Sequence, residues 1–283
     1  MSITKQYFMD GCFDGYHYGH VNAILQGKLL CDTLILGTHT NEEMTEHKND
    51  PLYNYSERIF MLKYCKYIDM FVGNVNYIVS CETLDKFNCS KYLHGNEVLI
   101  TRNGENGIDT NVINNRYITY ETTNGISTTS LLLRLYNYSL KKEITFNNNF
   151  DYLTNIYDKT IKYNLINYNN SKKIIYLEHS WDLLNSIHIK HVQKIKDKYF
   201  EYNLVAVVSN YDNEIYIYNQ LERAIILSSI KIIDNVIMKS EYINNDEIYI
   251  NLNNINNEYF LNFNKNDYIM NINFNKFKKK INL

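Results

Sequence analysis

Residues 5–38, KQYFMDGCFDGYHYGHVNAILQGKLLCDTLILGT, decide the fold class. The apolar run at 5–10 ends at an Asp-Gly pair that favours a turn, which predicts a short strand. Beyond it, apolar residues recur at helical spacing, so we expect a helix to begin near Gly19. The run TLILGT at 33–38 is typical of a buried parallel strand. The stretch therefore predicts a strand, a loop, a helix and a second strand.

The same alternation of helix and strand continues beyond residue 38. Helical spacing and apolar runs predict helices at about 56–67 and 81–87 and strands at 70–72 and 92–94. Such alternation predicts an α/β protein with a doubly wound parallel sheet, whose ligands bind beyond the carboxyl ends of the strands. Three loops are therefore expected to open onto one crevice, at 10–20, 38–53 and 94–97.

Composition narrows the possible partners and location. The formal net charge of the 283 residues is −2, which leaves no broad basic field for nucleic acid, so nucleic acid is not an expected partner. The five cysteines are odd in number and form no CxxC pair, which favours a reduced protein in the cytoplasm. No stretch of about 18 residues escapes charge or strong polarity, so no integral membrane segment is expected and any membrane contact is peripheral.

An internal repeat emerges when the two halves are aligned without gaps. YLEHSWDLLNSIH at 176–188 runs parallel to FMDGCFDGYHYGH at 8–20, and LER at 221–223 echoes SER at 56–58. Strands are expected again at 173–178 and 204–209. We therefore predict a tandem duplication with a first domain at 1–140, a helical connector at 141–170, and a shortened second copy at 171–283.

The HYGH motif at 17–20 carries the chemistry. It follows a predicted strand and opens a predicted helix, where free N–H groups and the helix dipole favour a phosphate. Gly19 lets the backbone approach closely. His17 and His20, one turn apart, can both donate hydrogen bonds to charge that develops at a phosphorus centre. The alternative is that they merely cap the helix or lie on the surface.

Further segments agree with this motif: GTHTNEE at 37–43, EHK at 46–48, SER at 56–58, ETLDKFNC at 82–89, HGN at 94–96 and GISTT at 125–129. Taken together, nearly all of residues 6–136 closely resemble ethanolamine-phosphate cytidylyltransferases. The resemblance implies a Rossmann-like nucleotidyltransferase fold. It also implies transfer of CMP from CTP to phosphoethanolamine, giving CDP-ethanolamine and pyrophosphate for phosphatidylethanolamine synthesis, with Mg²⁺ accompanying CTP.

The resemblance also assigns roles to individual residues. The implied catalytic residues are His17, His20 and Lys48. The implied CTP-binding residues are Gly11, Cys12, Phe13, Gly19, Arg58, Gly95, Asn96, Gly125, Ile126, Ser127, Thr128, Thr129 and Arg134. The implied phosphoethanolamine-binding residues are Asp14, Tyr77 and His94. No protein-bound metal is implied. Without the match, a loop lysine such as Lys48 is usually just solvated, and the 125–129 segment reads as an ordinary helix N-cap.

Two departures from the family pattern matter. Glu121-Thr-Thr-Asn124 stands where relatives usually carry a basic residue and Thr, so triphosphate binding should weaken unless Arg116 or Arg102 substitutes. Glu97 replaces the usual Asp. Phosphocholine or glycerol 3-phosphate transfer, adenylyl transfer from ATP, and a non-catalytic nucleotide-binding scaffold remain alternatives.

The second copy has lost parts of the motif. Asn185 and Ile187 stand at the positions of the first histidine and the glycine, and only His188 remains. A bulky side chain at the glycine position blocks a phosphate, so a catalytically silent pseudo-domain is predicted. The basic tail at 276–280 can touch anionic lipid or simply be solvated. A homodimer is compatible with the sequence.

Overall fold

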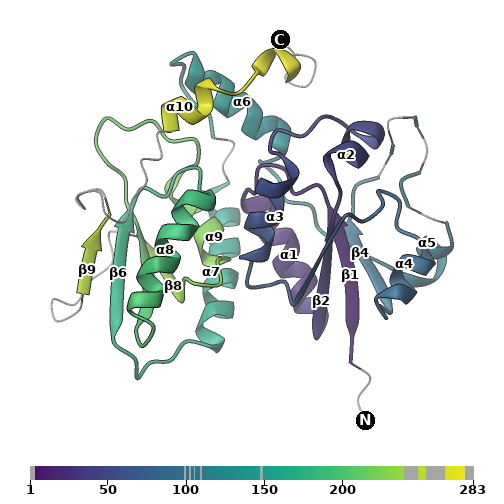
Figure 1. Ribbon diagram of the computed structural model, residues 1–283, viewed down its shortest axis with the longest axis horizontal. Coiled ribbons are helices and arrows are strands. Elements are labelled where there is room, and N and C mark those ends of the chain that lie inside the picture. Colours follow the sequence, from purple (N-terminus) through teal and green to yellow (C-terminus); the bar gives the residue numbers. More distant parts are fainter. Residues whose placement is uncertain are drawn as a thin grey trace. The chain divides into compact units, whose positions relative to one another are not determined.

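The computed structural model describes residues 4–98, 100–101, 103–104, 106–108, 110–146, 149–238, 248–252 and 265–277 (Figure 1). The chain forms two compact units, residues 1–124 and 125–283. The division lies earlier than the expected domain end at residue 140, because the helix that follows residue 127 packs within the second unit. None of the described helices combines the length and apolar character needed to span a bilayer.

The first unit contains the predicted doubly wound sheet. Its five strands are all parallel and lie in the order β3-β2-β1-β4-β5. They are β1 (Gln6–Gly11), β2 (Thr33–Thr38), β3 (Met70–Gly73), β4 (Lys91–Gly95) and β5 (Tyr117–Tyr120). The helices between them are α1 (Tyr18–Leu30), α2 (Asn41–His47), α3 (Tyr55–Lys63), α4 (Cys81–Lys86) and α5 (Thr110–Arg116).

Burial on both faces explains why the strands are apolar runs rather than alternating patterns. On one face, Phe8, Ile35 and Tyr92 belong to the same core cluster, which also takes in Leu84 of α4. On the other face, Gly27 of α1 lies close to the side chains of Met9, Leu34 and Leu93. The sheet is thus covered by helices on both sides, as the strand–helix alternation predicts.

The expected loop at 38–53 is partly wrong, because it contains helix α2. Thr40 caps this helix by accepting a hydrogen bond at 3.2 Å from the backbone N–H of Glu43. Acidic Glu42 and Glu43 in the first turn also suit the positive end of the helix dipole. Only one apolar side chain of α2, Met44, is buried, so the segment offers no apolar stripe from which sequence periodicity could identify a helix.

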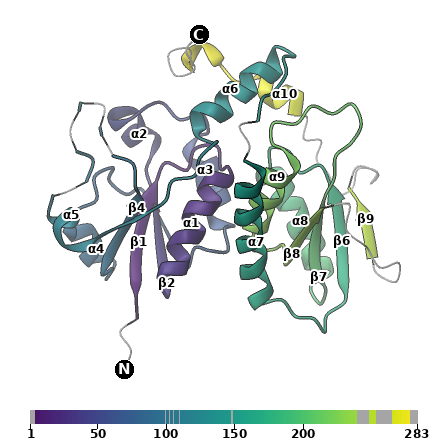
Figure 2. The same ribbon diagram turned by 180° about the vertical axis from the view of Figure 1, so that it is seen from behind.

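The second unit has four parallel strands in the order β8-β7-β6-β9 (Figure 2). Its strands are β6 (Ile174–His179), β7 (Asn203–Val208), β8 (Asn235–Met238) and β9 (Ile248–Asn251). Its helices are α6 (Thr128–Ser139), α7 (Phe150–Ile166), α8 (Ser186–Lys198), α9 (Gln220–Ser228), α10 (Lys265–Met270) and the 3₁₀ helix η1 (Phe274–Phe277). The expected connector is α7, which packs against α9 and β8.

The two units repeat the same polar anchor. The carboxylate of Asp14 accepts hydrogen bonds at 2.8 Å from the consecutive backbone N–H groups of residues 52–53. In the second unit, Asp182 accepts hydrogen bonds at 2.9 and 3.0 Å from residues 217–218 in the same way. The anchor ties the loop after the first strand to the segment before a helix in both units. The two sheets and this shared anchor are consistent with a tandem duplication.

A buried arginine is repeated as well. Arg58 donates a hydrogen bond at 2.8 Å to the carbonyl oxygen of Cys12, and Arg223 donates to the carbonyl oxygen of Ser180. Backbone conformation is repeated too, because Phe13 and Trp181 both adopt a positive φ, of 47° and 58°. This agreement supports the ungapped alignment of the two halves.

Candidate active site

The two histidines of the HYGH motif form a stacked pair at the start of α1. His17 is the N-cap residue, and its ring lies 3.8 Å, centroid to centroid, from the ring of His20, with 15° between the planes. The backbone N–H of His17 donates to Nδ1 of His20 at 3.4 Å. Because Nδ1 accepts, the neutral His20 ring carries its proton on Nε2, which makes Nε2 a hydrogen-bond donor.

His20 is electrically neutral at physiological pH. Burial, with a smaller contribution from the positive charge of Lys48, lowers its pKa to about 3. The edge of the Phe13 ring also packs against it, at 5.4 Å between centroids. His20 can therefore stabilise negative charge by donating a hydrogen bond, rather than by contributing a full positive charge.

Lys48 is the C-cap residue of α2, and its backbone N–H donates a hydrogen bond to the carbonyl oxygen of Met44 at 2.9 Å. Its side chain is exposed, and its ammonium is close enough to influence His20 electrostatically. The structure thus brings the three predicted catalytic residues, His17, His20 and Lys48, to the carboxyl edge of one sheet.

Arg58 fixes the loops around this edge. It is buried and donates hydrogen bonds to the carbonyl oxygens of Cys12 at 2.8 Å and His39 at 2.9 Å, and to Oδ1 of Asn41 at 3.0 Å. The two carbonyls lie on the loops that follow β1 and β2, and Asn41 is the first residue of α2. Arg58, expected to contact CTP, therefore acts in this structure as a positioning residue that joins two walls of the crevice.

The loop at 11–14 is closely packed. A Cβ atom added at Gly11 would lie 3.1 Å from the ring of Phe13, so a larger residue would push that ring. Asp14, expected on the phosphoethanolamine side, is buried, and both of its oxygens accept backbone hydrogen bonds from residues 52–53. Its observed contacts are those of a loop anchor.

The HGN segment forms the far wall, at the end of β4. Oδ1 of Asn96 accepts hydrogen bonds from the backbone N–H of Thr122 at 3.2 Å and from its hydroxyl at 3.0 Å. The Asn96 amide donates to Glu121 at 2.8 Å. A Cβ atom at Gly95 would lie 2.7 Å from Cγ2 of Thr122, so only glycine fits there without displacement. His94, half-buried, places its Nδ1 3.0 Å from the Gly95 carbonyl oxygen.

Tyr77 is buried between two histidines. Its ring lies 5.0 Å from the ring of His39 and 5.1 Å from the ring of His47, with which it stacks. Its backbone N–H donates to Glu43 at 2.9 Å. Burial raises the pKa of the phenol, so Tyr77 stays protonated and can serve as a donor.

Asp10 and His39 form a buried polar pair that the sequence pattern did not predict. Nε2 of His39 lies 3.4 Å from a carboxylate oxygen of Asp10, and its Nδ1 lies 3.1 Å from the carbonyl oxygen of Val75. The hydroxyl of Tyr92 donates to the other oxygen of Asp10 at 2.6 Å. His39 is the single histidine of the GTHT run at 37–40. One histidine in so short a run does not predict a contact with Asp10 in strand β1.

The GISTT segment belongs to the second unit. Ser127 caps α6 by accepting a hydrogen bond at 3.1 Å from the backbone N–H of Ser130, as an ordinary N-cap does. Gly125 adopts a φ of 86°, Ile126 is buried, and Thr128 and Thr129 form the first turn of α6. A role of these residues at the first unit's crevice stays a prediction.

Arg134 has a partner other than the one expected. Its guanidinium is buried and forms two hydrogen bonds with the carboxylate of Glu222, at 2.9 and 3.0 Å, and a third with the carbonyl of Ile217 at 3.2 Å. Phe146 also lies against it, at 4.9 Å from the ring centroid. Its charge is thus neutralised inside the second unit, and this structure does not offer it to a phosphate.

The missing basic residue before Gly125 is not replaced by Arg116. Arg116 pairs with Asp85 at 2.6 Å and donates to the carbonyls of Cys89 and Ser90. These residues precede β4, so Arg116 lies at the amino edge of the sheet, opposite the crevice. Arg102 and residues 278–280 of the basic tail lie outside the described residues.

The equivalent position in the second unit lacks most of the machinery. Asn185 caps α8 by accepting a hydrogen bond at 2.9 Å from the backbone N–H of Ile187. His188 is buried, and burial lowers its pKa to about 3. Counting back from the shared loop anchor places Asn213 at the position of Lys48. Of the three positions predicted to be catalytic, only one keeps its residue type in the second unit.

Comparison with known proteins agrees with this geometry. Residues 8–134 match the family model described as cytidylyltransferase-like. The probable ethanolamine-phosphate cytidylyltransferase of Schizosaccharomyces pombe is 33% identical over 66% of this chain and 59% of its own length. The mouse ethanolamine-phosphate cytidylyltransferase is 39% identical over 44% of this chain and 31% of its own. The mouse choline-phosphate cytidylyltransferase A is 26% identical over 45% of this chain and 35% of its own.

The sheet and the HYGH motif are consistent with this match, in which residues 8–134 are similar to the cytidylyltransferase-like family of nucleotidyltransferases. Within that family, the chain is similar to the ethanolamine-phosphate cytidylyltransferases. The chain spans less than two thirds of the length of the first two of these relatives.

Proposed function

We propose that the first unit transfers CMP from CTP to phosphoethanolamine, giving CDP-ethanolamine and pyrophosphate for phosphatidylethanolamine synthesis. The observation that carries the proposal is the stacked His17–His20 pair at the N-terminus of α1, with Lys48 acting electrostatically on it. The names of the relatives supply the substrate, and the family match at residues 8–134 includes this pair.

The proposed reaction is one displacement at phosphorus. A phosphate oxygen of phosphoethanolamine attacks the α-phosphorus of CTP, and a new P–O bond forms while the bond to the bridging oxygen of the β-phosphate breaks. Pyrophosphate leaves with that oxygen. Negative charge on the α-phosphoryl oxygens is stabilised by the Nε2–H group of His20 and by the positive end of the α1 dipole. The Lys48 ammonium reduces repulsion between the two anionic substrates.

Mg²⁺ enters this proposal as part of the CTP substrate. Among the described residues, no group of three or more His, Cys, Asp or Glu side chains is arranged to hold a metal ion. In the proposal the triphosphate oxygens coordinate the ion, as is usual where Mg²⁺ binds through substrate phosphates. The catalytic side chains argued above act on the α-phosphoryl group.

Acceptor choice is tested by offering each substrate alone. The full chain is incubated with CTP, Mg²⁺ and phosphoethanolamine, phosphocholine or glycerol 3-phosphate, and pyrophosphate release is measured. Phosphoethanolamine is expected to give the highest kcat/KM. The matching region in mouse is 39% identical for the ethanolamine enzyme and 26% for the choline enzyme, which favours this order. Turnover confined to phosphocholine would contradict the proposal.

A second candidate, a nucleotide-binding protein without turnover, is favoured by one observation. Glu121 stands before the GISTT segment where a cation is expected, and it accepts a hydrogen bond from Asn96 at 2.8 Å. A carboxylate there repels a triphosphate. This candidate predicts CTP binding without pyrophosphate release in the same assay. ATP in place of CTP tests adenylyl transfer.

The cytoplasm is the proposed location. All five cysteines are free thiols, which suits a reducing compartment. Mass-spectrometric mapping of the thiols in protein isolated under alkylating conditions tests this, because stable disulfides would indicate an oxidising compartment.

A further inference from the structure

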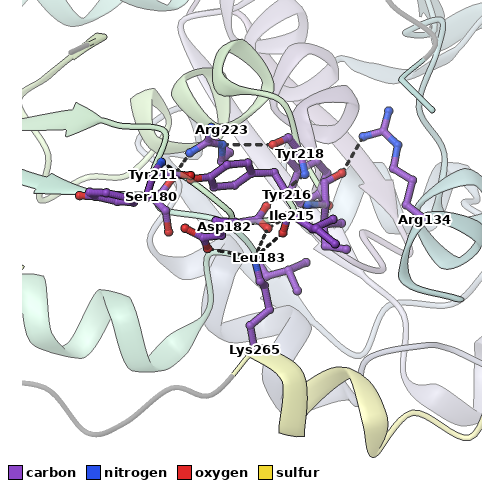
Figure 3. A network of polar contacts seen from close by, with 12 residues as sticks. Arg134, Ser180, Asp182, Leu183, Tyr211, Ile215, Tyr216, Tyr218, Arg223 and Lys265 are labelled. Carbon is purple, nitrogen blue, oxygen red and sulfur yellow. Dashed lines mark hydrogen bonds and ion pairs between the residues drawn. The ribbon is translucent and has the colours of Figure 1, made fainter. Parts of the chain in front are cut away.

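The carboxyl edge of the second sheet holds the ammonium of Lys265 (Figure 3). Lys265, the first residue of α10, donates from Nζ to Asp182 at 3.1 Å, to Glu214 at 3.0 Å and to the carbonyl oxygen of Ile215 at 2.8 Å. Asp182 follows β6, and residues 214–215 follow β7. The lysine therefore reaches the edge at which ligands bind in this class of sheet.

The surroundings match a primary ammonium group. Such a group has three N–H donors, and the three acceptors satisfy all of them. The rings of Tyr216 and Tyr138 also lie 5.3 and 5.4 Å from Nζ, which places the cation against two aromatic rings. The Lys265 side chain is only 14% exposed. A quaternary ammonium could use the rings but none of the three acceptors.

The charges agree with this geometry. Burial by itself lowers the pKa of the Lys265 ammonium, but the carboxylates of Asp182 and Glu214 outweigh burial, so the pKa is raised above its usual value. The ammonium is thus firmly charged in place. Without it, two carboxylates would remain at a largely buried site.

The aligned positions of the first unit lack two of the residues of this site. The shared loop anchor aligns Glu214 with Asn49 and Tyr216 with Pro51, so the first unit has neither the second carboxylate nor the ring. A pocket of about 430 Å³ adjoins the site and is lined by residues that include Glu214, Ile215 and Tyr216. A small molecule has room beside the acceptors.

We propose that the second unit contains a primary-ammonium site at its carboxyl edge, formed by Asp182, Glu214, the Ile215 carbonyl, Tyr216 and Tyr138, and that the chain fills this site with its own Lys265. The occupant closes the second unit's edge to free amines and fastens α10 to the sheet. Removing the side chain of Lys265 creates a vacant site for a small alkylammonium ion.

Chemical rescue in the full chain tests this. Lys265→Ala is expected to lower the melting temperature by about 5–10 °C, because the buried carboxylate of Asp182 and the half-buried carboxylate of Glu214 lose their shared cation. Ethylammonium chloride at about 50 mM is expected to restore about 3 °C of that loss through binding to the folded state. Tetramethylammonium chloride and sodium chloride at equal concentration should restore none. Lys194→Ala, which removes an exposed lysine, is the matched control and should show neither loss nor rescue.

The proposal is overturned if ethylammonium, tetramethylammonium and sodium chloride stabilise folded Lys265→Ala protein equally. If the variant does not fold, the unaltered chain decides. Lys265 should then be acetylated at least about tenfold more slowly than Lys194, since a held ammonium must first lose its partners and its proton. Equal reactivity of the two lysines would overturn the proposal as well.

Discussion

His17 and His20 stack ring against ring at 3.8 Å, and the corresponding pair in the second unit is Asn185 and His188. A stacked pair of imidazoles at a helix N-terminus brings two hydrogen-bond donors close to a bound phosphoryl group. Asparagine at the first position keeps the cap but loses one imidazole. The two units therefore share a fold while differing in the groups that we propose act in displacement at phosphorus.

Arg58→Ala should destabilise the first unit and also lower turnover. The guanidinium joins the carbonyls of Cys12 and His39, so its loss leaves buried acceptors unpaired and frees two walls of the crevice. We expect the free energy of unfolding to fall by about 3 kcal/mol, measured by urea denaturation. CDP-ethanolamine formation per folded molecule should fall in parallel.

Arg223→Ala is the matched control, because Arg223 makes the equivalent contacts in the second unit, including one to the carbonyl of Ser180. It should lose similar stability but keep turnover per folded molecule. Equal loss of turnover in both variants would show that the second unit takes part in the reaction.

Stability should rise with pH between about 3 and 6.5. Burial lowers the pKa of His20 and of His188 to about 3, whereas an unfolded histidine titrates near 6.5. In this window the unfolded state binds more protons, so the free energy of unfolding is highest above pH 6.5 and is lost as pH falls toward 3. The slope is at most about 1.4 kcal/mol per pH unit for each histidine.

The pH dependence is checked by denaturation of His20→Gln and His188→Gln at several pH values. Each substitution should flatten the slope between pH 3 and 6.5 relative to the unaltered chain. An unchanged slope in His188→Gln, the more deeply buried position, would mean that this histidine is not held neutral by burial.

Gly95→Ala should lower stability and CTP affinity through a clash that a second substitution removes. The added Cβ would lie 2.7 Å from Cγ2 of Thr122, at the junction held by Asn96. Overpacking of this kind costs about 1–3 kcal/mol. Thr122→Ser deletes the clashing methyl group and keeps the hydroxyl. The double variant should regain most of the stability and CTP affinity that Gly95→Ala loses; additive losses would rule out this clash.

Local sequence patterns were sufficient to predict the main strands and helices of the first unit. β2 occupies residues 33–38 as expected, and α1 begins at Tyr18, one residue before the predicted start. Strands buried on both faces are continuous apolar runs, and these runs survive the high Tyr and Asn content of the chain. The placement of His17, His20 and Lys48 at one edge follows from the parallel topology.

Polar pairs between residues far apart in the chain could not be predicted from the sequence. Arg134 meets Glu222 across 88 positions, and Lys265 meets Asp182 across 83. A charge at either position carries no sign of its partner, because such pairs are made by tertiary packing and have no periodicity. The pairing of Arg134 with Glu222 was therefore not predicted, although the helix that carries Arg134 was correctly expected, and its assignment to a phosphate stays a prediction.

The most direct test of the account is CDP-ethanolamine formation by His20→Ala in the full chain, with CTP, Mg²⁺ and phosphoethanolamine. The account predicts a loss of about 10²–10³-fold in kcat, with CTP still bound, because a transition-state donor is removed. His188→Gln should keep the turnover of the unaltered chain. Unchanged turnover in His20→Ala would contradict the assignment of the reaction to the HYGH site.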